Sequence, residues 1–336
     1  MSETSKDMMQ VKNLHINFKT PDGIVPAVTG VSFSIAPGES VALVGESGSG
    51  KSVTAMSCMR LLASPPASVK ADIMKFEGMD LLSLSMDDMR KVRGNDMSMI
   101  FQEPMTSLNP LLTIGYQIAE AASLHLGLLG AEASLYAIQM LERVGIPDAA
   151  KRAKEYPHQM SGGMRQRVMI AMALSCNPRL LIADEPTTAL DVTIQAQILK
   201  LIDDLQKEIG MALLLITHNL GIVAQKTERI MVMYAGQIVE SAATNNVFIN
   251  PAHPYTDGLL RSIPCAERKV KRLNVISGVV PSPMFFPKGC RFSPRCPNTK
   301  DHCVETPPDL IELSPGHMVR CHYPLSFSTF EKGDIL

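Results

Sequence analysis

The chain has 336 residues, of which 46% are hydrophobic and 19% charged, so it can bury a sizeable core and lacks the composition of a disordered protein. Its 32 Lys and Arg residues balance 33 Asp and Glu residues, which argues against a nucleic-acid partner, because proteins that bind phosphate backbones usually carry a basic excess. The longest run without these charges, 209–225, is shorter than the roughly 20 residues that cross a bilayer. We therefore expect a cytosolic protein of about two domains, with no signal peptide and no membrane span.

The first 60 residues have the patterns of strands and turns followed by a helix. Loose alternation of apolar residues predicts strands over 9–18 and 28–35. The apolar run 40–44 predicts a short buried strand, and a helical pattern then continues to about residue 62.

The middle of the chain has a different character. Residues 111–144 are rich in Ala, Leu, Ile and Glu at helical spacing, which predicts a helical insertion. Helices and strands then alternate over 161–174, 179–184, 194–209, 211–217 and 229–233. This alternation predicts a mostly parallel sheet that helices cover on both faces.

Prolines interrupt the chain from about residue 250 onward, and they break any long element. We therefore place a domain boundary there. It separates a main domain, 1–250, with a helical subdomain over about 103–160, from a small irregular appendage, 251–336.

Residues 45–52 fit the pattern G-x-x-x-x-G-K-[ST] between a predicted strand and a predicted helix, the setting that a phosphate-binding loop requires. Glycines let successive backbone N–H groups turn inward around an anion, and the helix that follows directs its positive end at it. Lys51 can reach the β- and γ-phosphates, and Ser52 can hold Mg²⁺. The candidate nucleotide-binding residues are Gly45, Glu46, Ser47, Gly48, Ser49, Gly50, Lys51 and Ser52.

Two acids follow a later apolar run, 180–183. In a parallel sheet the carboxyl ends of the strands line the ligand crevice. Asp184 is therefore suited to the Mg²⁺ shell, and Glu185 to orienting and deprotonating the water that attacks the γ-phosphate.

Further residues complete an ordered set that resembles the ABC-transporter ATPases over residues 9–250. They are Gln102, Ser161, Gly162, Gly163, Met164, Asp191 and His218, and Phe18 stands where the family has an aromatic residue. The resemblance implies a P-loop ATPase core with an antiparallel β part at its N-terminus, and it implies ATP and Mg²⁺ as ligands. Met164 stands where the family usually has Gln, a variant that also resembles the peptide importers.

The resemblance also implies a role for each of these residues. Phe18 would stack on adenine, Gln102 would contact Mg²⁺ or the attacking water, and His218 would contact the γ-phosphate. Residues 161–164 resemble the signature loop, whose hydroxyl and helix N-terminus suit the γ-phosphate of ATP held by the other subunit. Asp191 resembles the loop that links two active sites across a dimer.

The segments 183–197, 250–256, 289–290 and 294–297 narrow the resemblance to the ATPases of dipeptide and oligopeptide importers. Nickel and glutathione importers share much of this pattern. The resemblance implies a bacterial subunit on the cytoplasmic face of the inner membrane. Its partners would be a second, distinct ATPase, two membrane-spanning permeases and, indirectly, an extracytoplasmic solute-binding protein.

Five of the seven cysteines follow residue 260, and four of them are spaced C-x5-C-x6-C-x17-C: Cys290, Cys296, Cys303 and Cys321. This is neither the spacing of a zinc ribbon nor that of a common ferredoxin. Four thiolates suit a [4Fe–4S] cluster or Zn²⁺, reduced thiols remain an alternative, and His302 or His322 could substitute as ligands. Members of the resembled subfamily can carry a [4Fe–4S] cluster in this region, so we prefer a cluster to Zn²⁺ or reduced thiols. Cys58 and Cys176 are predicted core residues, and Cys265 is given no role.

The sequence therefore predicts the ATP-hydrolysing motor subunit of a peptide importer. One alternative is an importer of another solute, and another is a non-transport ABC ATPase that acts on ribosomes or DNA. A third is a nucleotide-dependent assembly or redox-sensing module that leaves hydrolysis to its partner. The sequence does not identify the solute.

Overall fold

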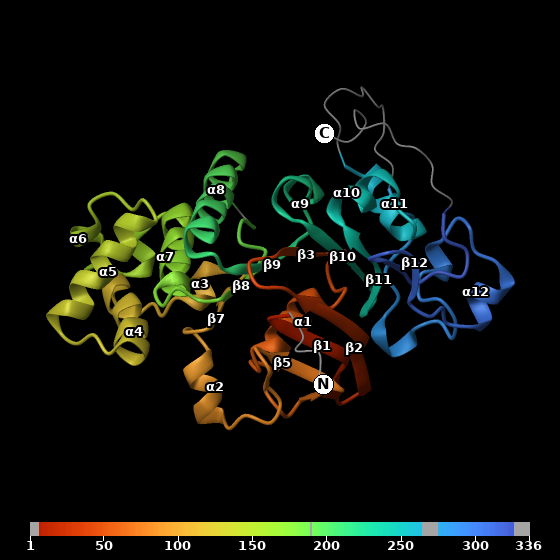
Figure 1. The fold of residues 1–336 in the computed structure, drawn as a ribbon, viewed down its shortest axis with the longest axis horizontal. Coiled ribbons are helices and arrows are strands. Elements are labelled where there is room, and N and C mark those ends of the chain that lie inside the picture. The colour runs from red at the N-terminus through yellow and green to blue at the C-terminus, as the bar shows by residue number, and fades with distance from the viewer. Residues whose placement is uncertain (1–6, 189, 264–274, 326–336) are drawn as a thin grey trace. The chain divides into compact units, whose positions relative to one another are not determined.

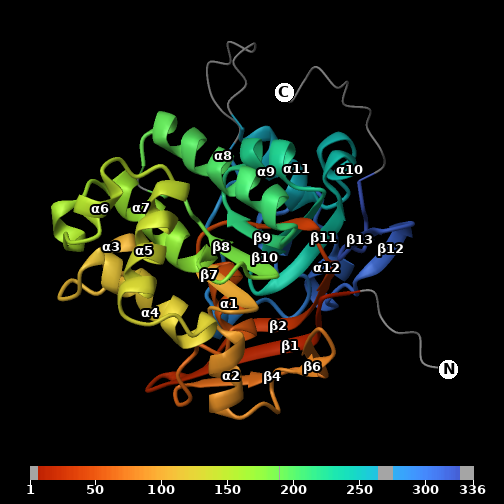
Figure 2. The ribbon, with the colours of Figure 1, turned by 60° about the vertical axis from the view of Figure 1, so that its left-hand side comes forward.

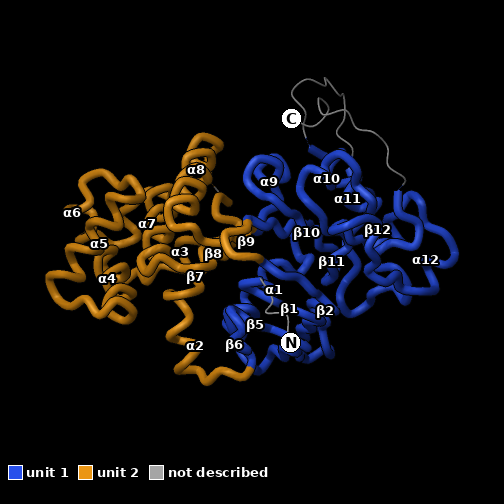
Figure 3. The backbone as a smooth tube through the Cα atoms, viewed as in Figure 1, with its two compact units in different colours: residues 1–35, 40–82, 216–336 blue, residues 36–39, 83–215 orange. Residues whose placement is uncertain are grey.

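The structure is a computed structural model that describes residues 7–188, 190–263 and 275–325. It divides into two compact units (Figure 3). Unit 1 comprises residues 1–35, 40–82 and 216–336, and unit 2 comprises residues 36–39 and 83–215. The residues after 250 thus belong to the same unit as the N-terminal strands, and the domain boundary near residue 250 stays a prediction.

An antiparallel sheet forms the N-terminal part of unit 1 (Figure 1). Its strands are β1 (Met9–Thr20), β2 (Gly23–Ile35), β4 (Ala67–Lys70), β5 (Ile73–Phe76) and β6 (Met79–Asp80). They follow the order β2-β1-β5-β6, and β4 also pairs with β1. Met9 and Val11 on β1 are buried, as the alternating pattern predicts, and Leu14 is buried after a register shift in the pairing with β2.

A second sheet in unit 1 carries the phosphate loop. The strands of this sheet include β3 (Ser40–Val44), β10 (Arg229–Tyr234), β11 (Gln237–Ala243), β12 (Ile311–Ser314) and β13 (His317–Val319). β3 and β10 are parallel, whereas β11 and β13 add antiparallel strands beyond β10. Every residue of β3 is buried, as the apolar run predicts. The helices of this part are α1 (Lys51–Cys58), α9 (Leu220–Lys226), α10 (Thr244–Ile249) and α11 (Pro254–Arg261).

The C-terminal region is more regular than its prolines indicate. It contains the short helices η2 (Pro283–Phe285), η3 (Ser293–Arg295) and α12 (Asp301–Glu305), and β13 pairs with β11. The fully buried Glu240 of β11 anchors this region, because its carboxylate accepts hydrogen bonds from the backbone N–H groups of Ala252 and His253. It also lies 2.8 Å from Nε2 of His317. Such long-range contacts leave no periodic signal in the sequence.

Unit 2 contains the strands β7 (Met97–Ile100) and β8 (Leu180–Asp184), which are parallel. The division between the units falls within β9 (Ala212–Thr217). The helices of unit 2 are α2 (Met86–Val92), α3 (Pro104–Ser107), α4 (Ile114–Leu126), α5 (Ala131–Arg143), α6 (Ala149–Arg152), η1 (Pro157–Gln159), α7 (Gly162–Leu174) and α8 (Val192–Ile209). Figure 2 shows α4 to α7 gathered together, as expected of a helical insertion.

Among the described residues, no single helix has the length and apolar character needed to cross a membrane. The helices α4 and α5 are long and apolar enough only when they are taken together, and the chain bends by 116° between them.

Candidate functional site

The phosphate loop connects β3 to α1, as its motif predicts, and two of its glycines are sterically required. A Cβ atom on Gly45 would lie 2.1 Å from the carbonyl oxygen of Met233 on β10. Gly50 has a φ of 104° and forms the N-cap of α1, so it occupies a backbone region that other residues rarely adopt. The loop therefore has room for backbone only where it passes over β10.

Lys51 is held inside this loop. Its ammonium group donates hydrogen bonds to the carbonyl oxygens of Gly45 at 2.8 Å and Glu46 at 2.9 Å, and its side chain is nearly buried. The backbone N–H of Ser49 also donates to the Glu46 carbonyl, at 3.2 Å. The loop is thus organised around Lys51, whose charge can exchange these carbonyl oxygens for phosphate oxygens.

In unit 2, the residues predicted for water activation lie together. Asp184 is the buried last residue of β8, and Glu185 follows it. The amide of Gln102 donates to the Glu185 carboxylate at 3.1 Å, and the hydroxyl of Thr188 donates to the same oxygen at 2.8 Å. Gln102 reaches this position because it follows β7, which runs parallel to β8. Thr188 was not among the predicted residues, because a helix or strand pattern does not mark it.

The predicted signature residues begin α7. The Ser161 hydroxyl accepts a hydrogen bond from the Met164 N–H at 3.3 Å, so it forms the N-cap of this helix. A Cβ atom on Gly163 would lie 3.0 Å from Ile194 of α8, so a glycine allows the two helices to approach. Ser161 is exposed, as a contact with a ligand on another subunit requires.

Asp191 is the N-cap of α8, and its carboxylate accepts from the Ile194 N–H at 2.9 Å. His218 follows β9 in unit 1 and is exposed. Phe18 is half-buried on β1, opposite Val25 of β2 and Ala67 of β4. The ligand contacts of Phe18 and His218, and the role of Asp191 in linking two active sites, stay predictions.

The four predicted cysteine ligands line one small cavity, together with His253 and His322. The cavity has a volume of about 20 Å³, which is room for about one water molecule. Burial raises the pKa of the Cys290 and Cys296 thiols, and it raises that of Cys321 to about 11. The six cysteines that the structure describes form no disulfide, and Cys265 lies outside the described residues.

The donor set of this cavity suits a four-thiolate centre, but its present spacing is not that of metal ligands. Within 7–188, 190–263 and 275–325, no three His, Cys, Asp or Glu side chains are arranged to hold one ion. A cluster would require the cavity to widen, because its present volume is room for about one water molecule. His322 is already engaged, because its Nε2 lies 2.9 Å from the carbonyl oxygen of Thr306.

Comparison with known families agrees with this geometry. The family model for ABC transporters matches residues 28–188, which include the phosphate loop, Gln102, the signature residues and the acidic pair. A second model, for the C-terminal region of oligopeptide and dipeptide transporters, matches residues 239–303. The oligopeptide transport ATP-binding protein AppD of Bacillus subtilis is 52% identical over 314 residues, which is 94% of this chain and 96% of AppD. The chain belongs to the ABC-transporter family.

Other relatives of this ABC-transporter chain agree with the assignment. A putative peptide import ATP-binding protein of Brucella melitensis is 52% identical over 325 residues. The similarity covers 94% of this chain and 96% of that protein. Among solved structures, the ATP-binding cassette MJ0796, in a dimeric post-hydrolysis state with ADP and Pi, is 29% identical with a TM-score of 0.63. That similarity covers 70% of this chain and 99% of the cassette, so the fold predicted from the motifs is confirmed.

Proposed function

We propose that this chain is the ATP-hydrolysing motor subunit of a bacterial importer for dipeptides or oligopeptides. The observation that carries the proposal is Glu185, a carboxylate at the end of β8 that Gln102 and Thr188 hold in one orientation. The phosphate loop supplies the nucleotide site, and the names of relatives that are about half identical supply the substrate class.

Different residues of the chain have different roles in phosphoryl transfer. Residues 45–50 offer backbone N–H groups to the phosphates, and Lys51 neutralises charge that develops on the γ-phosphoryl group. Glu185 orients the attacking water and accepts its proton, and His218 contacts the γ-phosphate. Phe18 stacks on the adenine ring.

The oxygen ligands that Mg²⁺ prefers are available on Ser52, Gln102 and Asp184. The donor chemistry fits, because a hydroxyl, an amide and a carboxylate supply hard oxygen atoms. The ion would neutralise phosphate charge.

We further propose that Ser161, Gly162, Gly163 and Met164 act on ATP held by a second ATPase subunit, a distinct homologue of this chain. The exposed N-terminus of α7 supplies N–H groups and the positive end of a helix. Hydrolysis then removes the γ-phosphate contacts that hold two subunits closed, which makes closure a two-state switch.

The base assignment predicts that Glu185→Gln keeps nucleotide binding and lowers the turnover number by about 10²–10⁴-fold, the usual contribution of a general base. Glutamine still accepts from Gln102 and Thr188, so the site keeps its shape while it loses its proton acceptor. ATPase rates and ATP dissociation constants of the full chain in its transporter measure this. Glu132→Gln, on an exposed acid of α5, is the control. Hydrolysis by Glu185→Gln at the parental rate would show that the base is elsewhere.

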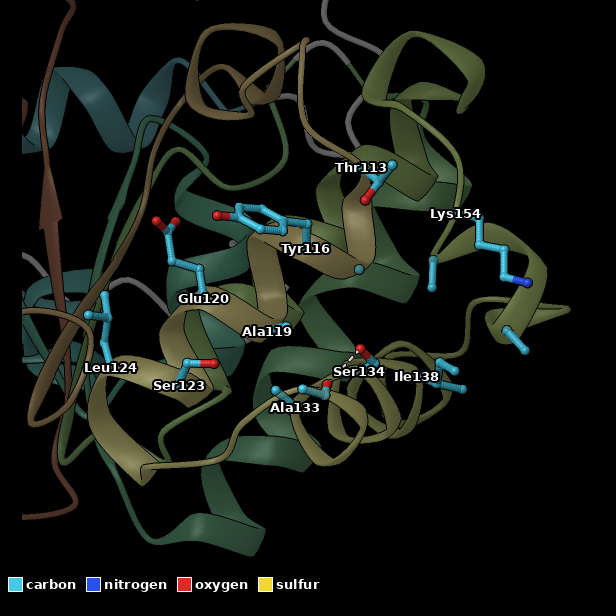
Figure 4. Close-up of a pocket in the computed structure, with 14 residues that line it drawn as sticks. Thr113, Tyr116, Ala119, Glu120, Ser123, Leu124, Ala133, Ser134, Ile138 and Lys154 are labelled. Carbon is cyan, nitrogen blue, oxygen red and sulfur yellow. Dashed lines mark hydrogen bonds between the residues drawn. The ribbon is translucent and has the colours of Figure 1, made fainter.

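The permease partners would bind unit 2, at a pocket between α4, α5 and α6 (Figure 4). Its lining is mostly apolar and includes Tyr116, Leu124 and Ile138, and Tyr116 and Leu124 are 57% and 74% exposed. Leu111 and Leu129, which are close in the chain to the lining residues Thr113 and Gly130, are also exposed. A helix or loop of a membrane-spanning permease suits this surface, which would place the chain at the cytoplasmic face of the inner membrane. A solute-binding protein outside the membrane would complete the importer.

We propose that Cys290, Cys296, Cys303 and Cys321 hold a [4Fe–4S] cluster. Their shared cavity and their lack of disulfides support it. The full chain purified without oxygen should then contain about four iron atoms per chain and show cluster absorbance, both of which Cys303→Ser should remove. Cys176→Ser, at a buried cysteine outside this cavity, is the control. One zinc ion per chain, or no metal, would contradict the cluster.

A further inference from the structure

A buried arginine of the C-terminal region contacts the phosphate loop. Arg295 is the last residue of η3 and precedes Cys296, and its side chain is 4% exposed. Its two terminal nitrogens donate to the two carboxylate oxygens of Glu46, at 2.7 Å and 3.0 Å. Glu46 is the second residue of the phosphate loop. This two-pronged geometry is the strong form of an arginine–carboxylate pair.

The guanidinium group of Arg295 is itself held in place. Its Nε donates to the carbonyl oxygen of Ser277 at 3.0 Å, and Nη2 also donates to that of Ile276 at 3.3 Å. A planar group that is fixed by both backbone and carboxylate loses the freedom that makes most surface ion pairs weak. Arg295 therefore defines where the Glu46 carboxylate lies.

The backbone of Glu46 depends on the same region. Its N–H donates to the hydroxyl of Tyr255 at 2.9 Å. Tyr255 is fully buried, and its ring centroid lies 4.6 Å from that of Tyr234 and 5.4 Å from that of Phe292. Residues after 250 thus hold Glu46 by both its main chain and its side chain.

The position of Glu46 matters for ATP because its carbonyl oxygen accepts from Lys51 and from the Ser49 N–H. A shift of Glu46 would move both the turn of the loop and the ammonium group that is to meet the phosphates. We propose that Arg295 is a positioning residue for ATP, which holds the phosphate loop in its binding conformation through Glu46. The inference rests on the proposed function of residues 45–52 as the ATP site.

The proposal gives the C-terminal region a role in the nucleotide site. Arg295 lies outside the part of the chain that matches the ABC-transporter model, 28–188, and inside the part that matches the oligopeptide-transporter model, 239–303. The segment that carries Cys290, Cys296 and Cys303 would therefore be mechanically connected to ATP binding.

The test is the dissociation constant of the full chain for Mg²⁺ and a non-hydrolysable ATP analogue, measured by calorimetry. Arg295→Met should weaken binding by about 5-fold or more, which is the lower end of typical coupling between sites. Arg295→Lys, which keeps the charge and loses the two-pronged contact, should fall between Arg295→Met and the parent. In a Glu46→Ala background, Arg295→Met should add little, because both variants remove the same contact.

Arg320→Met is the matched control. Arg320 is also partly buried in the C-terminal region, and its side chain donates to the carbonyl oxygens of Ile238 and Pro308 rather than to the phosphate loop. Thermal unfolding without nucleotide reports the structural effect of each variant. Equal weakening of binding by Arg320→Met and Arg295→Met would overturn the proposal, as would parental affinity in Arg295→Met. Arg295→Lys provides the comparison if Arg295→Met does not fold.

The two proposals can fail separately. If the parent and Lys51→Ala bind the analogue equally weakly, residues 45–52 are not the ATP site and the proposed function fails. If Lys51→Ala abolishes binding but both Arg295 variants bind like the parent, only the positioning role of Arg295 fails.

Discussion

Glu185 has a φ of 46°, in the left-handed region that residues with a side chain rarely adopt. Such backbone conformations persist where the surroundings hold them, and they are frequent at functional sites. Here Gln102 and Thr188 supply the surroundings through their hydrogen bonds to the carboxylate. The residue in this backbone conformation is also the one that chemistry assigns to the attacking water.

His253 is the N-cap of α11 and links the residues after 250 to the sheet. Its Nδ1 accepts from the Tyr255 N–H at 3.0 Å, and its backbone N–H donates to Glu240. Only an unprotonated Nδ1 can accept. Burial lowers the pKa of His253 from 6.5 to about 4, although the nearby Glu240 carboxylate acts in the opposite direction.

The chain should therefore lose stability in acid. Between pH 6.5 and pH 4 the unfolded chain binds a proton at residue 253 that the folded chain does not, so the free energy of unfolding falls as the pH falls. These two pKa values correspond to a fall of about 2 kcal/mol in the free energy of unfolding between pH 7.5 and pH 5. Urea denaturation at both pH values measures it. His253→Asn keeps a capping oxygen without titrating, and an equal loss in that variant would refute the assignment.

At the scale of elements, the helical patterns over 161–174 and 194–209 predicted α7 and α8 closely. The structure adds the caps, because the side chains of Ser161 and Asp191 bond to N–H groups three residues away. The apolar runs of β3 and β8 were equally clear, since both strands are buried throughout. The short strands β4 to β6 escaped prediction because runs of two to four residues show no periodicity.

The C-terminal elements depend on close approach of the backbone at Gly289. A Cβ atom there would lie 2.3 Å from the carbonyl oxygen of Cys303 and 2.6 Å from that of Val304. The same approach allows the Cys290 N–H to donate to Cys303 at 2.7 Å. The glycine thereby brings two predicted cysteine ligands to one cavity.

We expect Gly289→Ala to destabilise this region by about 1–3 kcal/mol, the usual cost of overpacking, because backbone atoms cannot move aside as side chains can. Chemical denaturation together with hydrogen exchange at the Cys290 amide measures the effect. Gly316→Ala, in the open turn between β12 and β13, should cost only about 1 kcal/mol from its positive φ. If the two variants behaved alike, close packing at Gly289 would not be the cause.

At the scale of the whole molecule, the balanced charge and the exposed apolar side chains favour protein partners over nucleic acid. A tagged chain should therefore co-purify from membranes with a second ATPase and two polytopic proteins. Leu124→Glu, at the pocket of unit 2, should lower recovery of the polytopic proteins by about tenfold, as expected for a charge placed in an apolar interface. Val279→Glu, at an 84% exposed site in unit 1, is the control.

Equal recovery with Leu124→Glu and Val279→Glu would place the docking surface elsewhere. Co-purification with ribosomes or DNA would instead favour a non-transport role. Recovery of this chain alone, as a pair of identical subunits, would contradict the proposal of a distinct ATPase partner.

The sequence alone determined the family, the phosphate loop and the acidic strand end, because these depend on residue types at short, fixed spacing. It could not predict how Gln102 meets Glu185, since that contact depends on two strands that pair in parallel over a separation of 83 residues. The cysteine set was recognised by residue type, but only the fold showed that all four line one cavity. The interpretation of Glu46 changed most between sequence and structure. In the sequence it is a variable position of a motif, whereas in the structure it binds Arg295, 249 residues away. Such contacts are decided by tertiary packing, because bringing distant side chains together requires the whole fold around them.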